Sequence, residues 1–247
     1  MTDGPFADPR LVELYDLDNT DGPDHDFFRG VADEIDARTI VDLGCGTGLL
    51  TVTLAKPGRT VIGIDPSQTM LDHARQRSGA AAVTWVGGDA SAILPALSGS
   101  SADLMIMSGN VAQHILGEAW LQTLRHLHDA LRPGGLVAFE SRNPEGRAWE
   151  DWTEDATRGS RDTAHGRLTE WVEVTSIEDG EVSFAAHNLF EQTGEDAVQH
   201  STLAFRSAEE LTSHLAAAGL AVRSIHGGWA SEPVTATSRV YVITAQR

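Results

Sequence analysis

The sequence predicts an α/β fold in which a doubly wound parallel sheet carries an antiparallel β insertion after its fifth strand. Two observations support this prediction. Through the middle of the chain, short apolar β-branched runs alternate with longer segments of helical period, which is typical of parallel strands joined by helices on both faces of a sheet. After Pro144 the alternation stops, and runs with strand periodicity follow one another directly. A chain of 247 residues has room for one such domain with an insertion.

The parallel part is expected to contain five strands and the helices between them. The strand runs are 39–43, 61–64, 83–86, 103–107 and 136–139. The helical segments are 49–55, 67–77, 90–97 and 118–131. Ser67 is a typical helix N-cap residue, and Pro133, Gly134 and Gly135 end the last of these helices with a turn.

The later part of the chain has a different pattern. Three strand runs, separated by turn residues, are expected at 168–177, 182–190 and 198–205. Ser207 and Glu210 then form a capping-box pattern that opens a helix ending at Gly219, and two further strands are expected at 221–226 and 239–244. The predicted parts are therefore an N-terminal helical lid, a main domain made of two segments, and an antiparallel insertion that serves as a substrate lid. Their residues are 1–38, 39–145 with 207–247, and 146–206.

Composition excludes several classes of partner. The 36 acidic residues outnumber the 18 basic ones, which gives a formal net charge of −18. This balance argues against binding a nucleic-acid backbone or an anionic membrane, both of which need clustered cations. No apolar run is long enough to cross a bilayer, the first residues lack the apolar core of a signal peptide, and the single cysteine, Cys45, suits a reducing compartment. We therefore expect a cytoplasmic protein, monomeric or homodimeric.

The negative charge is unevenly distributed. Residues 1–38 hold 11 acidic against 3 basic side chains, and residues 146–206 hold 13 against 5. Residues 39–145 are nearly neutral, with 9 against 7. The predicted lid and insertion therefore carry most of the net charge, either as solvated surfaces or as a field over a bound substrate.

A glycine-rich loop follows the first predicted strand. Residues 42–48 read Asp-Leu-Gly-Cys-Gly-Thr-Gly, and Asp65 ends the second strand about 20 residues later, where a carboxylate can accept both hydroxyls of a ribose. A dinucleotide fingerprint would place its third glycine where Leu49 stands, and Asp42 would repel a pyrophosphate. The loop therefore favours a nucleoside cofactor whose tail carries an ammonium group.

Four motifs in this order resemble the class I S-adenosylmethionine-dependent methyltransferases. They are residues 41–48, residues 63–67 followed by Met70 and Leu71, residues 88–90, and residues 131–135. The resemblance spans about 100 residues and implies a Rossmann-like sheet of seven strands, with S-adenosyl-L-methionine as cofactor and S-adenosyl-L-homocysteine as product. The runs 221–226 and 239–244 match the last two strands of that sheet, one of which is antiparallel in the family.

The resemblance also implies which residues bind the cofactor. The loop would hold the methionine part and ribose, Asp65 the ribose hydroxyls, and Pro66 the adenine ring. Asp89 and Ala90 would contact the adenine amino group, although Asp89 alternatively caps the following helix. The expected cofactor-binding residues are Tyr15, Asp42, Gly44, Cys45, Gly46, Gly48, Asp65, Pro66, Met70, Asp89, Ala90, Met107, Ser108 and Gly109.

Acceptor-binding residues are expected after the fourth and fifth strands, because ligands bind beyond the strand carboxyl ends in such sheets. His114 is either a general base or a surface histidine, and Arg142 either clamps a substrate carboxylate or pairs with nearby acids. The tryptophans of the insertion either line the substrate site or pack the small sheet. The candidates are Asn110, His114, Arg142, Trp149, Trp152 and Trp171. The remaining histidines show no spacing typical of a metal site.

The function predicted from these residues is methyl transfer to a small molecule or a peptide, with an amine favoured because the acidic lid attracts cations. Residues 227–233 and 237–239 resemble enzymes that methylate peptide N-termini in bacterial natural-product pathways. The alternatives are O-methylation of a small metabolite, a catalytically silent regulator that binds S-adenosylmethionine, and a nicotinamide oxidoreductase.

Overall fold

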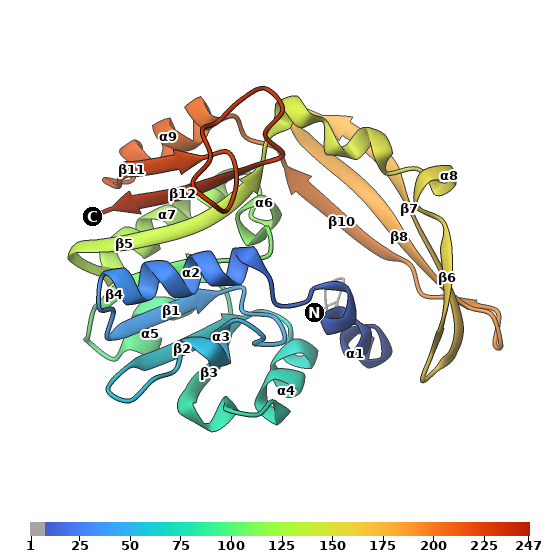
Figure 1. Ribbon diagram of the computed structural model, residues 1–247, viewed down its shortest axis with the longest axis horizontal. Coiled ribbons are helices and arrows are strands. Elements are labelled where there is room, and N and C mark those ends of the chain that lie inside the picture. Colours follow the sequence, from blue (N-terminus) through green and yellow to red (C-terminus); the bar gives the residue numbers. More distant parts are fainter. Residues whose placement is uncertain (1–7) are drawn as a thin grey trace.

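The chain forms two sheets, a seven-stranded mixed sheet and a smaller antiparallel sheet beside it (Figure 1). The computed structural model describes residues 8–247, so the first seven residues of the predicted lid lie outside it. The large sheet has the order β11-β12-β5-β4-β1-β2-β3, and the small one follows β5 in the chain. The predicted fold class is therefore confirmed. The large sheet consists of β1 (Thr39–Leu43), β2 (Thr60–Asp65), β3 (Val83–Gly87), β4 (Ala102–Met107), β5 (Leu131–Arg142), β11 (Ala221–His226) and β12 (Val240–Gln246).

Strand direction within the large sheet follows from its connections. Strands β1 to β5 pair in parallel because a helical crossover links each to the next, whereas β12 runs antiparallel to both β5 and β11. Strand β5 is longer than predicted and begins at Leu131. The turn expected at Pro133 to Gly135 is an irregularity inside β5, where its pairing with β4 shifts register.

Helices cover both faces of the large sheet. One face packs on α5 (Ile93–Leu97), α7 (Gly117–Ala130) and α9 (Ala208–Ala217), with Trp120 fully buried at its centre. The other packs on α2 (Pro23–Glu34) and α3 (Thr51–Leu54), with Phe28 fully buried. Apolar residues thus lie on both faces of the strands, as a doubly wound sheet requires. The remaining helices are α1 (Pro9–Asp18), α4 (Gln68–Gln76), α6 (Val111–His114) and α8 (Glu154–Thr157), with 3₁₀ turns at Ala80–Ala82, Ala90–Ala92, Pro144–Gly146 and Ala148–Asp151.

Both helix starts expected from capping patterns are present. The Ser67 side chain accepts a hydrogen bond from the Met70 N–H at the start of α4. Ser207 and Glu210 form the reciprocal capping box at the start of α9. Among residues 8–247, no helix combines the length and the apolar character that a membrane span requires.

The insertion sheet has two strands that the sequence pattern did not reveal. Its strands are β6 (Gly159–Thr163), β7 (Gly166–Glu178), β8 (Glu181–Phe190), β9 (Glu195–Asp196) and β10 (Gln199–Ala204). Strand β6 reads Gly-Ser-Arg-Asp-Thr and β9 has two acidic residues, so neither shows the apolar alternation by which strands are recognised. Both pair at the margins of the long β7–β8 hairpin.

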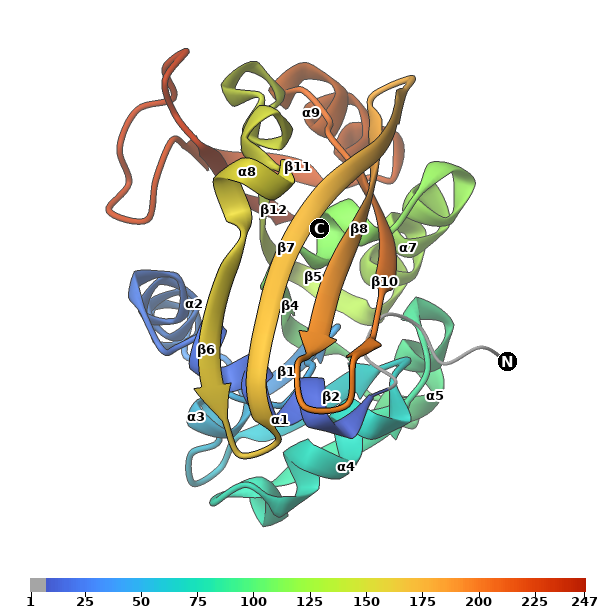
Figure 2. The same cartoon turned by 90° about the vertical axis from the view of Figure 1, so that its right-hand side faces the viewer.

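The two faces of the insertion sheet have different surroundings. Leu168 and Phe190 pack against Leu11 and Leu14 of α1, which lies between the two sheets. Trp171 lies three positions after Leu168 in β7. Its side chain therefore belongs to the opposite, outer face of the sheet, because successive side chains of a strand point to alternate sides. Figure 2 views the molecule from the side of this outer face. The α1 helix thus joins the insertion to the main domain.

Candidate cofactor and acceptor site

The loop after β1 must contain glycine for reasons of packing as well as backbone conformation. Gly44 has φ +74°, and a Cβ there would lie 2.3 Å from Cγ2 of Val111. Gly48 has φ +75°, and a Cβ there would lie 2.5 Å from the Trp85 ring. Gly46 has φ +53° but open space around its Cα, so a ligand has access to the backbone there.

Asp65 is held against this loop at the carboxyl end of β2. Its Oδ2 accepts a hydrogen bond from the Gly46 N–H, and its Oδ1 accepts one from the Ser67 N–H, both at 2.8 Å. The side chain is only 7% exposed, and this burial raises the pKa of Asp65 despite the two donors. The carboxylate is thereby fixed beside the loop, where the sequence predicted the ribose.

Asp42 is a buried acid at the end of β1. Its Oδ2 accepts a hydrogen bond of 2.6 Å from the Thr51 hydroxyl, whereas Oδ1 has no partner within the described chain. Burial raises the pKa of Asp42 to about 6. The neighbouring thiol of Cys45 is also buried, and burial together with the charges of Asp42 and Asp65 raises its pKa, so it is a packing residue and not a nucleophile.

The residues predicted for the adenine lie along the ends of β2 and β3. Pro66 is exposed, whereas Met70 and Ala90 are buried. Asp89 is the N-cap of the following 3₁₀ turn, and its Oδ1 accepts from the N–H and the hydroxyl of Ser91 at 2.9 and 2.6 Å. The capping role that the sequence left open is therefore present in the structure.

The N-terminal helix α1 is fastened to the glycine loop by Asp16. This carboxylate accepts a hydrogen bond of 2.6 Å from the Thr47 hydroxyl and forms an ion pair with Arg77. Arg77 also donates to the carbonyl of Thr47 at 3.0 Å. The neighbouring Tyr15 side chain reaches the end of β4, where its hydroxyl lies 3.9 Å from the position of a Cβ at Gly109. The sequence did not indicate that Asp16 would hold α1 against the glycine loop.

Tyr15 lies among acidic groups. Burial raises the pKa of its phenol, and the charges of Asp65, Asp16 and Glu140 raise it further. These carboxylates come from β2, α1 and β5, so Tyr15 is near the carboxyl ends of several strands. The segment Met107, Ser108 and Gly109, predicted to contact the cofactor, lies beside it at the end of β4.

The acceptor candidates after β4 lie on α6. Asn110 precedes this helix in a left-handed conformation, with φ +63°. Gln113 is buried and donates from Nε2 to the carbonyl of Ala204 in β10. His114 is exposed, and the surrounding protein together with the charge of Arg142 lowers its pKa. Arg206 holds α6 in place by donating to the carbonyls of Ala112 and Ile115 at 2.9 and 2.6 Å.

Arg142, at the end of β5, is half-buried and joins these candidates. Its guanidinium lies 3.4 Å from the Gln113 Oε1 and 5.6 Å from the centre of the Trp152 ring. Burial lowers its pKa, and the charge of Glu140 partly opposes this effect. Neither hydrogen bonds nor ion pairs to a carboxylate are found for Arg142 among residues 8–247. A half-buried guanidinium without an acidic partner can bind an anionic group.

Glu140, two residues earlier in β5, follows the fifth predicted strand, where acceptor-binding residues were expected, but no role was assigned to it from the sequence. It is 4% exposed; its Oε1 accepts a hydrogen bond from the Asn110 N–H, and its Oε2 has no partner in the described part of the chain. Burial raises the pKa of Glu140 to about 7. The sequence held a signal, because an acid directly after the apolar run Leu-Val-Ala-Phe is rare in a buried strand.

The tryptophans of the insertion separate into two groups. Trp149 and Trp152 pack edge-to-face on Phe205 and Phe184, and Trp152 also faces Arg142. Trp171 instead stacks on His187 at 4.3 Å on the outer face of the sheet. The structure therefore brings Trp152 to the acceptor candidates but places Trp171 apart from them.

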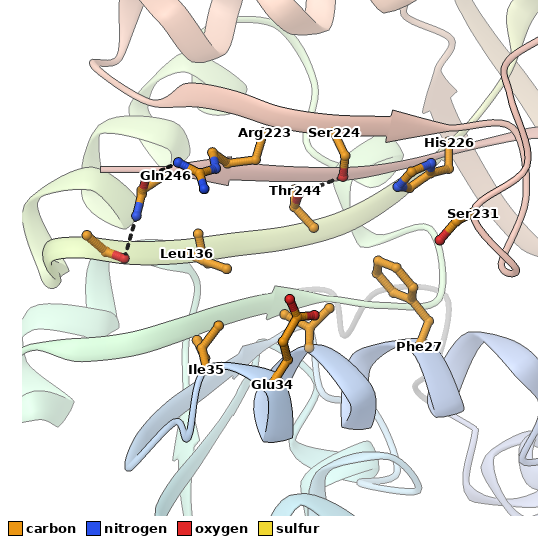
Figure 3. Close-up of a pocket in the computed structure, with 12 residues that line it drawn as sticks. Phe27, Glu34, Ile35, Leu136, Arg223, Ser224, His226, Ser231, Thr244 and Gln246 are labelled. Carbon is orange, nitrogen blue, oxygen red and sulfur yellow. Dashed lines mark hydrogen bonds between the residues drawn. The ribbon is translucent and has the colours of Figure 1, made fainter.

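Of two cavities in the molecule, one lies outside this region and the other borders it. One, of about 380 Å³, lies between α2 and the β5–β12–β11 part of the sheet, where Phe27, Glu34 and His226 surround it (Figure 3). The other, of about 410 Å³, is lined by Trp149, Trp152 and neighbouring residues of the insertion. The first contains none of the predicted site residues, whereas the second is lined by two predicted acceptor residues, Trp149 and Trp152.

The residues at the carboxyl edge of the large sheet fit S-adenosylmethionine. The open backbone at Gly46 leaves room for a ligand, Asp65 offers a fixed carboxylate beside it, and the unpartnered Oδ1 of Asp42 is an acceptor without a donor. A cofactor with ribose hydroxyls and a positively charged tail complements this set. Across residues 8–247, no group of three or more His, Cys, Asp or Glu side chains is arranged to hold a metal ion.

Comparisons with known proteins agree with this geometry. Residues 40–135 match the family model described as a methyltransferase domain. The cypemycin N-terminal methyltransferase of Streptomyces sp. is 28% identical over 255 residues, which cover 100% of both chains. The trans-aconitate 2-methyltransferase of Azoarcus sp. (strain BH72) is 40% identical over 109 residues, which cover 42% of this chain and 39% of that protein.

The fold also matches solved structures over its whole length. The CcbJ methyltransferase from Streptomyces caelestis superposes with a TM-score of 0.81 at 22% identity, covering 100% of this chain and 99% of that one. Residues 40–135 therefore form a methyltransferase domain, and together with the four motifs these matches support a class I S-adenosylmethionine-dependent methyltransferase with S-adenosyl-L-methionine as its cofactor.

Proposed function

We propose that this methyltransferase transfers the methyl group to an amine, either the terminal amine of a peptide or the amine of another small natural product. The observation that carries the proposal is the full-length similarity to the cypemycin N-terminal methyltransferase. That alignment includes the N-terminal helices and the insertion, which would cover the acceptor. The alignment with trans-aconitate 2-methyltransferase involves less than half of the chain, so it bears mainly on cofactor binding.

The chain's residues would divide the work between cofactor and acceptor. The glycine loop, Asp42 and Asp65 would hold S-adenosylmethionine, which supplies a methyl group on a positively charged sulfur. Tyr15 would cover the cofactor from α1, because Asp16 fixes that helix to the loop. Since the donor is already activated, the main task of the protein is to position the acceptor and exclude water.

The acceptor would lie between the ends of β4 and β5 and the inner face of the insertion sheet. Helix α6 connects these elements, since Gln113 bonds to Ala204 of β10 and to Arg142 of β5. Asn110, His114 and Trp152 would contact the acceptor there. The lowered pKa of His114 favours its neutral form, which offers a hydrogen-bonding nitrogen.

O-methylation of a carboxylate is the second candidate function. The half-buried Arg142 has no acidic partner among the described residues and would bind such a group. An acceptor that carries both an amine and a carboxylate, such as an amino acid or peptide, is compatible with either reaction. The two candidates therefore differ in which atom receives the methyl group.

The direct test uses S-adenosylmethionine with an isotopically labelled methyl group and a panel of acceptors. The panel contains short peptides with a free α-amino group, their Nα-acetylated counterparts, amino sugars and hydroxy acids. We expect label on nitrogen of a free amine and none on the acetylated control. Label on a carboxylate or hydroxyl oxygen would favour the second candidate, and no transfer to any acceptor would favour a regulator.

A further inference from the structure

We propose that Glu140 is the proton acceptor for the substrate amine, through the carboxylate oxygen that its surroundings leave without a partner. This inference rests on the proposed amine methylation. An amine attacks only in its neutral form, whereas a primary amine in water at pH 7 is mostly protonated. A methyltransferase for amines therefore benefits from a carboxylate that takes one proton from the bound ammonium group.

The position of Glu140 suits this role. It lies at the carboxyl end of β5, and its Oε1 is fixed by the Asn110 N–H at the end of β4. Oε2 is buried and has no hydrogen-bond partner in the described chain. An unpaired buried acceptor costs free energy unless a ligand supplies the missing donor. The structure thus holds one oxygen of Glu140 in place and leaves the other free for a cation.

The titratable groups around Glu140 come from three elements. Asp24 of α2 raises the pKa of Glu140, and Arg142 of the same strand lowers it. Tyr15 of α1 is also near, since the charge of Glu140 raises the pKa of its phenol. Burial is the largest influence and brings the pKa of Glu140 to about 7. A base with this pKa can both take up and release a proton near neutral pH.

The proposed step balances in protons and electrons. An N–H bond of the acceptor ammonium breaks, the proton goes to Oε2 of Glu140, and the electron pair stays on nitrogen. That pair then forms the C–N bond with the methyl group while the C–S bond breaks and its electrons remain on sulfur. The products are a methylated ammonium group and S-adenosylhomocysteine, and protonated Glu140 returns its proton to water.

The experiment compares Glu140→Gln with Glu140→Asp and with a control, Glu145→Gln, which alters an exposed acid in the loop after β5. Gln keeps an oxygen that accepts from Asn110 but cannot take a proton, whereas Asp keeps the carboxylate on a shorter stem. Three quantities are measured for each variant: the affinity for S-adenosylhomocysteine by calorimetry, the thermal midpoint, and the pH profile of kcat/KM with an amine from the panel.

We expect wild-type kcat/KM to rise with pH through a limb near pH 7. Glu140→Gln should lose this limb and about 100-fold in rate, which is within the usual contribution of a general base. Glu140→Asp should recover part of the rate, and Glu145→Gln should behave like the wild type. Affinity for S-adenosylhomocysteine should stay within about threefold in every variant.

Two results would overturn the assignment of Glu140. One is a Glu140→Gln enzyme that methylates the amine at the wild-type rate with the same pH limb. The other is a loss of tenfold or more in S-adenosylhomocysteine affinity, which would show that the carboxylate serves the cofactor. Failure of the proposed function is recognised separately, because then the wild-type enzyme itself does not methylate any amine.

Discussion

The carboxyl edge of the large sheet and the insertion sheet both contain acidic residues, but their acids differ in kind. In the insertion, arginines pair with many of the acids at the surface, as Arg158 does with Glu154 and Arg161 with Glu170. At the sheet edge, Asp42 and Glu140 are almost fully buried, and each keeps an oxygen without a partner in the described chain. The nearly neutral segment therefore contains buried acids that each have an oxygen free to meet a ligand.

This difference revises how the net charge relates to function. Most of the net charge lies in residues 1–38 and 146–206, and this distribution suggested a cationic acceptor. Ion pairs and solvent weaken the field of exposed acids, whereas a buried carboxylate keeps its full influence on its neighbours. We therefore expect individual buried acids to matter far more than the total charge of the insertion.

The largest expected effect on stability comes from Asp42→Asn. Because burial raises the pKa of Asp42 to about 6, the wild-type protein loses stability as the pH rises from about 4 to about 6. The amide avoids this loss and still accepts from Thr51. The variant should be more stable than the wild type by about 3 kcal/mol at pH 8 and nearly equal to it below pH 4.

Urea unfolding at a series of pH values, without cofactor, measures this difference. Asp72→Asn, a change at an exposed position of α4, is the matched control; it keeps Asp42, so its stability should follow that of the wild type across the pH series. A variant less stable than the wild type at pH 8 would contradict the view that the Asp42 carboxylate is retained at a cost to stability.

Asp65→Ala should have an effect of intermediate size, and this effect is on the binding of the cofactor. The substitution removes the carboxylate expected to hold the ribose and leaves the N–H groups of Gly46 and Ser67 without their acceptor. Affinity for S-adenosylhomocysteine should fall at least tenfold, or about 1.4 kcal/mol. Calorimetry on Asp65→Ala and on Asp72→Ala provides the comparison, and equal affinities in the two variants would refute the ribose assignment.

The smallest effect is expected for Glu154→Gln in the insertion. This residue pairs with Arg158 one helical turn away, and about half of each side chain is exposed. Exposed pairs of this kind contribute less than about 0.5 kcal/mol. Chemical denaturation should therefore hardly distinguish the variant from the wild type, and a loss above about 1 kcal/mol would show that the insertion depends on its surface ion pairs.

Much of the fold was predictable from local patterns. The strands β1 to β4 and the capping box at Ser207 follow from apolar periodicity and side-chain chemistry that act within a few residues. Strand β6 was not predicted because its residues are polar and show no apolar alternation. It forms a strand because it pairs with β7, and this pairing cannot be read from the composition of the segment. The bulge at Pro133 likewise depends on the partner strand β4.

The site was predictable where a motif fixes the backbone. The glycines of the loop are recognisable in the sequence because their φ values and the close approach of neighbouring side chains require glycine, and the loop holds Asp65 by a hydrogen bond from Gly46. The acceptor side depends on side chains that meet across distant elements, such as Glu140 with Asn110 and Arg142 with Trp152. Trp171 points to the outer face because of the register of its strand. A shift of one residue would turn its side chain to the inner face, and the sequence alone does not determine this register.

The most direct test of the central contrast compares one buried acid with several exposed ones in the same assay. Glu140→Gln removes one carboxylate at the sheet edge, and the triple variant Asp155→Asn, Glu178→Gln and Asp179→Asn removes three exposed acids of the insertion. With an amine acceptor at 0.15 M salt, kcat/KM should fall about 100-fold in the first and change less than about threefold in the second. A larger loss in the triple variant than in Glu140→Gln would contradict the account.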